Sequence, residues 1–295
     1  MQLPLPPPPA ADCLRLVMVG DIVGKPGLRI TCAAIPWLRR QLRADAIVVN
    51  AENAADGSGI RCKDYRRLID SGVDGITLGD HAYKKREIIE VLETADNIIR
   101  PANLPLQAPG KTHMLLHVRD GIRIAVTCLL GRVFMKPVDC PFQAIDGLLR
   151  ELDQQAPEVR VRLVDFHAEA TSDKQLMGRY LDGRVAAVMG THTHVATADE
   201  QILPGGTAFQ CDLGMTGPFE SILGRKIDAV LEATLHGVPL PFQVATEDVR
   251  LCGSWLDVDI ASGRCRRLGR IALSQLMLED YAAAVAAQSP QPRLL

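Results

Sequence analysis

The sequence of 295 residues lacks any apolar run approaching the roughly 18–20 residues that a helix needs to span a membrane. It also lacks a strong charge of either sign, because the formal net charge is −2 and no basic stripe is present. Binding to nucleic acid or to an anionic membrane through bulk electrostatics is therefore disfavoured. The eight cysteines include no C-x-x-C pair, which favours reduced, mostly buried thiols.

The N-terminal segment lacks the basic and apolar stretches of a secretory signal peptide. It holds Pro4 and the run 6–9, all proline, which favours an extended tail. We therefore expect a cytoplasmic protein in which residues 1–12 form a disordered tail. Residues 13–275 should form a single domain, since no linker or internal repeat interrupts them, and 276–295 should form a partly loose extension.

The first half of the chain alternates short apolar runs with helical patterns. The runs at 14–19, 46–50 and 75–78 predict buried strands. Helices are predicted at 28–43, 63–70 and 84–95. Alternation with short connections is typical of an α/β domain with a largely parallel sheet, in which functional polar residues gather at the carboxyl ends of strands.

The second half begins and ends with antiparallel signals. Arg119-Asp120-Gly121 predicts a hairpin between strands at 113–118 and 122–130. Ser172 to Gln175 matches a capping box that would open a helix. The remaining predicted elements are strands at 161–166, 186–189 and 207–211, helices at 143–154 and 224–235, and a closing hairpin of 255–260 with 265–273. Together these elements predict an α/β fold, a four-layer α/β/β/α sandwich of two mixed sheets flanked by helices.

His192 and His194 follow the apolar run that ends at Met189. In an extended segment, side chains two residues apart point the same way, so both imidazoles would face one point. Neutral imidazole is a common metal ligand that needs a fixed direction. The pair therefore predicts a metal site, provided that other parts of the chain send ligands to the same place.

Polar residues end the other predicted strands as well. The candidate set is Asp21, Glu52, Asn53, Asp80, His81, His167, His192 and His194. Mixed oxygen and nitrogen donors suit manganese, iron, zinc or similar ions. The set is larger than one four-coordinate ion uses, whereas two ions about 3.5–4 Å apart and bridged by one carboxylate would use it fully. Such a pair activates a bridging hydroxide to attack phosphorus, and a histidine away from the metals can protonate the departing oxygen.

The order of these motifs resembles that of the calcineurin-like metallophosphoesterases. More closely, it resembles the small bacterial branch of cyclic-nucleotide phosphodiesterases, which has glutamate-asparagine at the second motif. That branch also lacks a histidine two residues after the first aspartate, and Val23 stands there in this chain. The resemblance covers residues 14–273 and rests on the segments 20–21, 50–53, 79–81, 165–169, 171–174, 181–184, 190–194, 197–200 and 212–217.

The resemblance implies a ligand set and an activity. One metal would be held by Asp21, Glu52, Asn53 and His194, and the second by Glu52, Asp80, His167 and His192. Glu52 would bridge the two ions, and His81 would be the general acid. The implied substrates are cyclic nucleotides, 2′,3′-cyclic ones prominently, which would be hydrolysed to nucleoside monophosphates. Iron and manganese are the favoured ions, with magnesium or zinc as alternatives.

Asp80 departs from the superfamily motif, which has asparagine between the glycine and the histidine. Aspartate ligates as asparagine does but adds a negative charge. With asparagine, two divalent ions, two carboxylates and a hydroxide would carry a formal charge of about +1, whereas Asp80 lowers it to about 0. Asp80 therefore predicts either a mixed-valence iron-type centre or a lower activity.

Other polar residues receive weaker interpretations. Glu169 and Asp199 suit supporting or capping roles, since the ligand set is already complete. Arg132 is a weak candidate for contact with the substrate phosphate, and a surface role is the alternative. The histidines that end no predicted strand of this kind are read as structural: His113, His117 and His236.

Three functional hypotheses stay open from the sequence. The first is a dinuclear-metal phosphodiesterase, and the second is a phosphomonoesterase or nucleotidase on the same centre. The third is a weakly active, metal-bound regulatory or RNA-associated protein, although the lack of a basic stripe argues against RNA binding. The expected partner is a small-molecule cyclic nucleotide rather than a membrane, and a homo-oligomer is compatible with the sequence.

Overall fold

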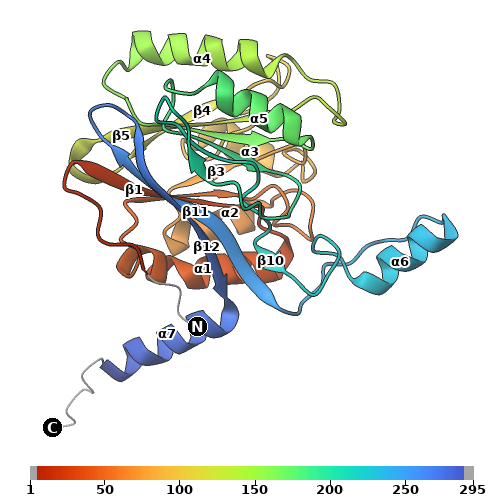
Figure 1. Cartoon of the computed structure of the whole chain (residues 1–295). Coiled ribbons are helices and arrows are strands. Elements are labelled where there is room, and N and C mark those ends of the chain that lie inside the picture. The colour runs from red at the N-terminus through yellow and green to blue at the C-terminus, as the bar shows by residue number, and fades with distance from the viewer. Residues whose placement is uncertain (1–4, 289–295) are drawn as a thin grey trace.

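The computed structural model describes residues 5–288, so residues 1–4 of the expected N-terminal tail and residues 289–295 of the expected C-terminal extension lie outside the described residues. Two six-stranded sheets pack face to face between layers of helices (Figure 1), which confirms the predicted four-layer fold. The first sheet has β1 (Cys13–Val19), β2 (Ala46–Asn50), β3 (Gly75–Thr77), β10 (Gly217–Pro218), β11 (Val249–Asp259) and β12 (Cys265–Ser274). The second has β4 (His113–His117), β5 (Arg123–Leu130), β6 (Arg162–His167), β7 (Ala187–Thr191), β8 (Gln201–Ile202) and β9 (Ala208–Gln210).

Both sheets are mixed, with a group of parallel strands joined to antiparallel ones. In the first sheet β1, β2 and β3 run parallel, while β11 joins β1 antiparallel and carries β10 and β12. In the second sheet β5, β6, β7 and β9 run parallel, with β4 and β8 antiparallel at the two edges. The carboxyl ends of the parallel strands are therefore the places where loops with polar residues collect.

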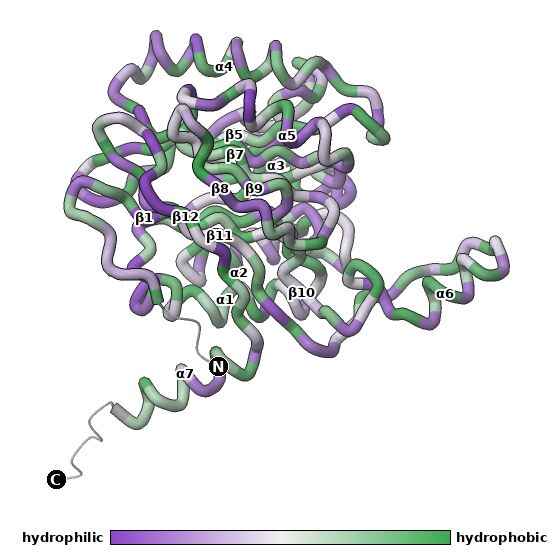
Figure 2. Tube along the Cα trace, in the orientation of Figure 1, coloured by the Kyte–Doolittle hydropathy of each residue, from purple (hydrophilic) through white to green (hydrophobic). Residues whose placement is uncertain are grey.

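Seven α-helices and one short 3₁₀-helix (η1, Arg119–Gly121) occur within residues 5–288. The hydrophobic core of the first sheet includes side chains of α1 (Gly24–Arg40), α2 (Cys62–Ser71), α3 (Ile88–Thr94) and α7 (Gln275–Gln288). The second sheet packs against α4 (Pro141–Gln155) and α5 (Thr171–Tyr180). Along α4, Figure 2 shows hydrophilic and hydrophobic residues alternating, as expected for a helix with one face on the core.

The central strands are largely apolar because both of their faces are buried. In β1, Leu16 and Met18 point into the core between the sheets, whereas Val17 and Val19 point toward the helices. Side chains alternate across a strand, so two buried faces require an unbroken apolar run rather than an alternating pattern. This is the physical reason why the strands were recognisable from sequence.

Some helix limits differ from those predicted. Helix α1 begins at Gly24 instead of residue 28, because Pro26 is tolerated in a first turn where its missing N–H needs no partner. It ends at Arg40, and Arg43 adopts a φ of 58°. The segment 84–95 is helical only over α3. The capping box at Ser172 is wrong, since α5 begins one residue earlier and its N-cap makes no side-chain hydrogen bond.

Both predicted hairpins are present. Strands β4 and β5 are joined through Asp120 and Gly121, which have φ values of 54° and 74°. Strands β11 and β12 pair antiparallel as expected, but β11 begins at Val249, six residues before the predicted start at residue 255. Four consecutive residues of this extra segment, 251–254, are buried, so it lacks the alternation that is typical of a strand with one exposed face.

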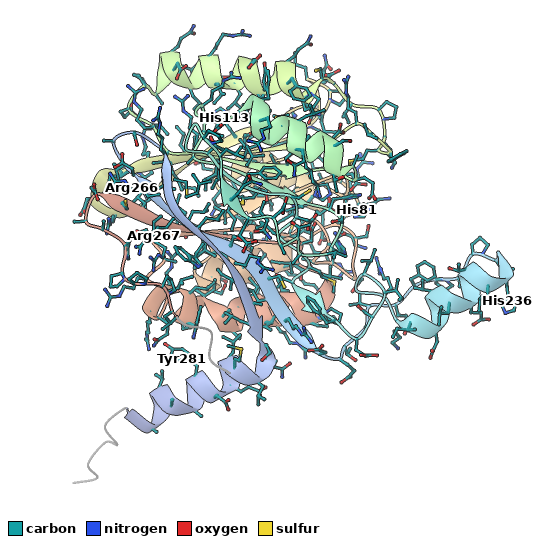
Figure 3. All side chains as sticks on the ribbon, in the orientation of Figure 1. His81, His113, His236, Arg266, Arg267 and Tyr281 are labelled. Atoms are coloured by element: carbon teal, nitrogen blue, oxygen red, sulfur yellow. The ribbon has the colours of Figure 1, made fainter. Side chains whose placement is uncertain are left out.

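Helix α6 (Ile227–His236) was predicted with an apolar face, but it has no buried residue. Figure 1 shows it projecting away from the body of the protein, and Figure 3 places His236 on this projection. Leu231 and Leu235 are 49% and 78% exposed. The helical period therefore predicted the helix correctly, and the structure shows that its apolar side chains are not buried.

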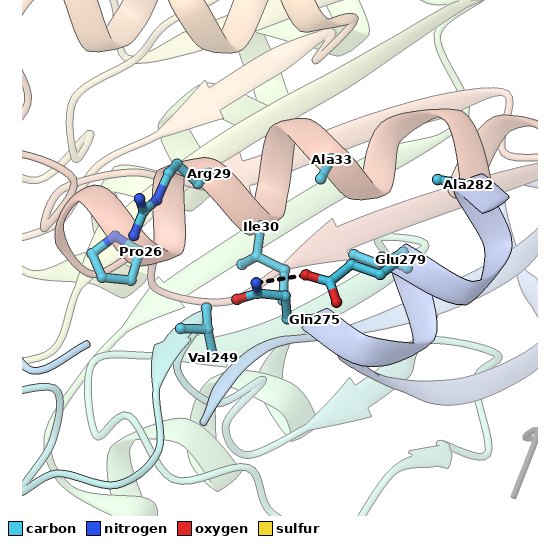
Figure 4. Close-up of a pocket in the computed structure, with 9 residues that line it drawn as sticks. Pro26, Arg29, Ile30, Ala33, Val249, Gln275, Glu279 and Ala282 are labelled. Atoms are coloured by element: carbon cyan, nitrogen blue, oxygen red, sulfur yellow. Dashed lines mark hydrogen bonds between the residues drawn. The ribbon is translucent and has the colours of Figure 1, made fainter. Parts of the chain in front are cut away.

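Segments near both ends of the described residues contact the body of the protein. The carbonyl of Pro7 accepts a hydrogen bond from Arg15 (2.8 Å), whose buried guanidinium also pairs with Asp257 (2.7 Å). Near the other end, α7 lies beside α1, and a cavity of about 340 Å³ separates them (Figure 4). The division into tail, domain and extension stays a prediction.

Two further observations concern the whole described chain. All eight cysteines are free thiols, and five of them are buried. No helix within residues 5–288 is long and apolar enough to cross a membrane.

Candidate metal centre

All eight candidate residues lie at the carboxyl ends of strands from both sheets. Asp21 follows β1, residues 52–53 follow β2 and residues 80–81 follow β3. His167 ends β6 in the second sheet, and His192 and His194 come directly after β7. The backbone N–H of His192 donates to Asp21 Oδ2 (3.0 Å), so the ends of the two sheets meet at this point. The structure therefore brings together every residue of the predicted set.

Four of these residues form one compact group of potential metal ligands. Glu52, Asp80, His167 and His192 each offer an atom, and these atoms all lie within 4.8 Å of one another. His167 Nε2 is 3.3 Å from Asp80 Oδ1 and 3.4 Å from Glu52 Oε1. His192 Nδ1 is 3.0 Å from His167 Nε2. Two carboxylates and two imidazoles at this spacing can hold a first-row divalent ion.

A second group lies on the other side of Glu52. Asn53 Nδ2 is 2.9 Å from Glu52 Oε1 and 3.2 Å from His194 Nε2. His194 Nε2 is in turn 4.0 Å from Asp21 Oδ1. In this arrangement Asn53 Oδ1 faces His81, so coordination of an ion by that oxygen requires the amide to rotate. Glu52 is thus the residue that belongs to both groups.

Two observations of the structure fit metal ions in this place. Asp21 is fully buried, and its Oδ1 has no hydrogen-bond partner. A buried carboxylate oxygen without a partner is costly unless a cation satisfies it. At Gly79, a methyl group would overlap both His167 Nε2 and Glu52 Oε2, so the close approach of these ligands requires a glycine.

Hydrogen bonds orient the imidazoles of His167 and His194, whose Nε2 atoms face the two groups of potential metal ligands. His194 Nδ1 donates to the carbonyl of Leu223 (3.2 Å), which leaves the lone pair on Nε2. His167 Nδ1 is 2.9 Å from the hydroxyl of Thr191, and that hydroxyl donates to Asp165 Oδ1 (2.6 Å). The Thr191 oxygen is therefore the acceptor for His167. Such supporting hydrogen bonds set the tautomer and direction of a metal-binding histidine.

The prediction that both histidines of the H-x-H pair project from an extended strand is wrong. Strand β7 ends at Thr191, and His192 and His194 adopt φ values of 98° and 63°. Non-glycine residues rarely adopt such left-handed backbone conformations, and they tend to occur at functional sites. As a result the two imidazoles diverge, with His192 beside His167 and His194 beside Asn53.

His81 lies at the edge of the cluster rather than within it. Its side chain is 29% exposed, its Nδ1 is 2.7 Å from Asn53 Oδ1, and its Nε2 is 3.7 Å from Asp80 Oδ2. The hydrogen bond with Glu52 raises the pKa of His81 above its ordinary value, and burial opposes this only in part. A partly exposed imidazole whose pKa is raised is suited to donating a proton to a leaving group.

Burial and mutual contact shift the other ionisable groups. Burial raises the pKa of Asp21 to about 6. Burial also works against ionisation of Glu52, but the charge and hydrogen bond of His167 hold the pKa of Glu52 well below its ordinary value. In return, Glu52 and Asp80 raise the pKa of His167 well above the ordinary value despite its burial. Perturbed groups that gather in this way are typical of functional sites.

Two buried carboxylates that support the centre were missed by the sequence analysis. Asp165 accepts hydrogen bonds from Thr191, Thr77 and Asn50. Asp212 accepts from the backbone and hydroxyl of Thr193, from Gly214 and from Lys174. Both lie within segments of the family resemblance, but their partners are distant in sequence, so no local pattern indicated these roles.

Lys174 and Asp212 form an ion pair (2.7 Å) in which both side chains are 1% exposed. Replacing Lys174 with methionine leaves the Asp212 charge without its cation. We expect this variant to lose about 3–5 kcal/mol of unfolding free energy, measured by urea denaturation. The matched control is Lys111→Met, which breaks an exposed pair with Asp96 and should cost no more than about 1 kcal/mol. Equal losses in the two variants would contradict the prediction.

The remaining sequence candidates lie outside both groups. Glu169 is half-exposed, with Oε2 3.1 Å from His192 Nε2. Asp199 accepts a hydrogen bond from the backbone of Cys211 (3.1 Å). Arg132 is exposed and its backbone N–H donates to Asp173 (2.9 Å), so a role for its side chain stays a prediction. Figure 3 shows His113 and His236 well separated from His81, and their structural interpretation stays a prediction.

Comparisons with known proteins match nearly the whole domain. The model of the YmdB-like protein family matches residues 17–271. A Bacillus subtilis protein named 2′,3′-cyclic-nucleotide 2′-phosphodiesterase is 40% identical over 262 residues, which cover 88% of this chain and 97% of that protein. A putative phosphatase/phosphodiesterase of Mycoplasma genitalium is 30% identical, over 91% of this chain and 95% of its own length.

Two solved structures share the fold at this level of identity. A hypothetical protein of Thermus thermophilus has a TM-score of 0.82 and 39% identity, over 88% of this chain and 99% of that one. A structure described as a novel phosphatase of Mycoplasma pneumoniae has a TM-score of 0.82 and 30% identity, over 90% of this chain and 96% of that one.

Proposed function

The chain belongs to the YmdB-like protein family, and from this premise we propose that it hydrolyses cyclic nucleotides to nucleoside monophosphates at a dinuclear metal centre. It is a hydrolase of phosphoric diesters, as are the relatives whose names state an activity on diesters. The B. subtilis relative makes 2′,3′-cyclic nucleotides the leading substrates. The observation that carries the proposal is the pair of ligand groups joined by Glu52, beside a buried Asp21 oxygen without a partner.

The proposed ligands divide between the two groups. Asp21, Asn53 and His194 would hold one ion, Asp80, His167 and His192 the other, and Glu52 would contact both. When bound, the two ions supply Lewis acidity and an activated water for in-line attack on phosphorus. The chain itself orients donors. Thr191 fixes the imidazole of His167 and the carbonyl of Leu223 fixes that of His194. Asp212 holds Thr193, which lies between the two histidines of the H-x-H pair.

His81 is proposed to protonate the departing ribose oxygen. It is the one candidate that is half-exposed, retains a raised pKa and lies outside the compact group of four. An alkoxide is a poor leaving group, so a proton delivered at this position accelerates the opening of a cyclic diester.

A substrate panel tests the proposal. The purified protein is loaded with manganese or iron, its metals are measured by elemental analysis, and hydrolysis of 2′,3′-cyclic AMP, 3′,5′-cyclic AMP and p-nitrophenyl phosphate is compared. We expect the 2′,3′-cyclic diester to give the highest kcat/KM. Preference for the monoester would instead support a phosphomonoesterase or nucleotidase. Metal-replete protein that binds the cyclic nucleotide without hydrolysing it would overturn the enzymatic proposal in favour of a regulatory role.

Asp80→Asn tests the departure from the superfamily motif. The structure places Asp80 in the compact ligand group, where its negative charge weakens attraction for an anionic phosphate. We expect Asp80→Asn to change the bound metals or to change kcat/KM by about tenfold or more. Elemental analysis and steady-state kinetics measure both quantities. Identical metals and kinetics in the parent and the variant would refute the idea.

The identity of the metals, the cytoplasmic location and self-association stay predictions. Iron or manganese is proposed from the mixture of carboxylate and imidazole donors. Light scattering of the metal-loaded protein would measure its oligomeric state.

A further inference from the structure

A cavity of about 340 Å³ lies between the loop 100–112 and the N-terminal end of α4. It is lined in part by Arg100, Thr112, Asp139, Cys140 and Gln143, and none of the candidate metal ligands contributes to it. Its volume falls within the range of small-molecule sites. The cavity and the metal centre therefore share no residue.

Arg100 is a buried cation without a counterion. Arg100 is one of the residues that line the cavity, it is only 3% exposed, and it takes part in no ion pair among residues 5–288. Nη1 donates to the carbonyl of Pro101 (2.9 Å), whereas Nε is buried and has no acceptor. A guanidinium keeps its charge at any physiological pH, so a buried one without an anion is unfavourable.

The neighbouring ionisable groups do not compensate this charge. Tyr83 and Cys128 both lie within electrostatic reach of Arg100, and burial raises the pKa of each above its ordinary value. Both are therefore neutral at neutral pH. Asp139 lines the cavity but is exposed, so solvent screens it.

The same cavity faces the beginning of a 15-residue helix. The N-cap of α4, Cys140, makes no side-chain capping hydrogen bond, and Pro141 has no N–H. Cys140, Gln143 and Ala144, all at this end, line the cavity. The N–H groups of a first turn have no partner within the helix, and the helix dipole makes this end attractive to anions.

We propose that this cavity is a second anion site, which binds a phosphate group that is either free or carried by a nucleoside monophosphate. A guanidinium together with a helix N-terminus is a donor arrangement that matches the several oxygens of a phosphate. The Thr112 hydroxyl supplies a further donor on the lining. The site does not depend on the proposed catalytic activity, because inorganic phosphate alone is its first probe.

The first experiment locates the anion directly. Crystals of the full chain are soaked in tungstate, an analogue of phosphate, and its anomalous scattering is mapped. We expect a tungstate beside Arg100 and the first turn of α4, in addition to any at the metal centre. Tungstate confined to the metal centre would overturn the proposal.

The second experiment measures affinity by calorimetry of the manganese-loaded protein with inorganic phosphate and with AMP. Gln143→Glu places a carboxylate at the exposed start of α4 and should weaken binding about tenfold. The matched control is Gln154→Glu, the same change near the other end of that helix, which should leave binding unchanged. Asp139→Asn should strengthen the binding of phosphate. Arg100→Met should abolish it, although this buried position also affects folding.

Binding of phosphate at the metal centre is measured separately from binding at the second site, through its inhibition of hydrolysis. The inhibition constant should be the same in the parent and in Gln143→Glu, whereas the calorimetric affinity of the second site should differ. Tighter binding of AMP than of phosphate assigns the site to a nucleotide, and equal or weaker binding assigns it to free phosphate. Equal phosphate affinity in the parent, Gln143→Glu and Asp139→Asn would refute the site.

Discussion

Replacing His81 with glutamine is expected to lower kcat for 2′,3′-cyclic AMP by about 10²–10⁴-fold, while the metal content stays that of the parent. The reason is position: the imidazole borders the ligand groups through Asn53 and Asp80, yet it is not a member of the compact group of four. The amide N–H of glutamine can still donate a hydrogen bond to Asn53 Oδ1, but it is not acidic enough to protonate the departing oxygen. Steady-state kinetics and elemental analysis of the same preparations measure the two quantities.

The leaving group distinguishes a general acid from a structural residue. Bis(p-nitrophenyl) phosphate releases a phenolate that needs little protonation, so its hydrolysis should fall far less in His81→Gln than that of the cyclic nucleotide. His236→Gln is the matched control, because His236 lies on the projecting helix α6 (Figure 3). Equal losses for both substrates, or loss of metal, would show that His81 holds the centre together instead of donating a proton.

Replacing Glu52 with glutamine should remove the residue shared by the two ligand groups. Glu52 is 1% exposed, and its Oε1 is 2.9 Å from Asn53 Nδ2 and 3.4 Å from His167 Nε2. A neutral amide in this place cannot balance two cations. We expect the metal content to fall from about two ions per chain to about one or fewer, and kcat/KM to fall more than about 100-fold, since even residues that only support ligands are worth 10–100-fold.

The control for this prediction is a second glutamate next to the centre. Glu169 contacts His192 from outside the two groups and is 49% exposed, so Glu169→Gln should keep both ions. Elemental analysis counts the metals, and circular dichroism of each variant verifies the fold. If Glu52→Gln retained two ions, Glu52 would not bridge them.

Several parts of the site were predictable because they depend on local patterns. Asp21, residues 52–53 and residues 80–81 each follow an apolar run that is buried on both faces. Parallel strands bring such ends to one edge, so their proximity followed once the strands were recognised. The division of His192 and His194 between two ligand groups, which the family resemblance implied, agrees with their neighbours in the structure.

Other parts depended on contacts that the sequence does not display. Asp165 is held by Asn50, which is 115 residues away, and Asp212 by Lys174, 38 residues away. The left-handed backbone at His192 and His194 reflects where the loop after β7 is held, because their side chains alone do not favour it. The apolar side chains of α6 likewise gave no sign that this helix leaves the body of the protein.

The sequence by itself determined most of the order of strands and helices, all but β8, β10 and α7, together with the polar strand ends and the family. Apolar periodicity and short motifs are properties of neighbouring residues, which is why they can be read from sequence. Only the tertiary structure decided which oxygen of Asp21 lacks a hydrogen-bond partner and which hydroxyl orients His167. It also decided that Arg100, which has no counterion among the described residues, lines a cavity. The physical reason is that burial and hydrogen-bond satisfaction are set by packing between distant segments. The same arginine in another fold would pair with an acid or with solvent.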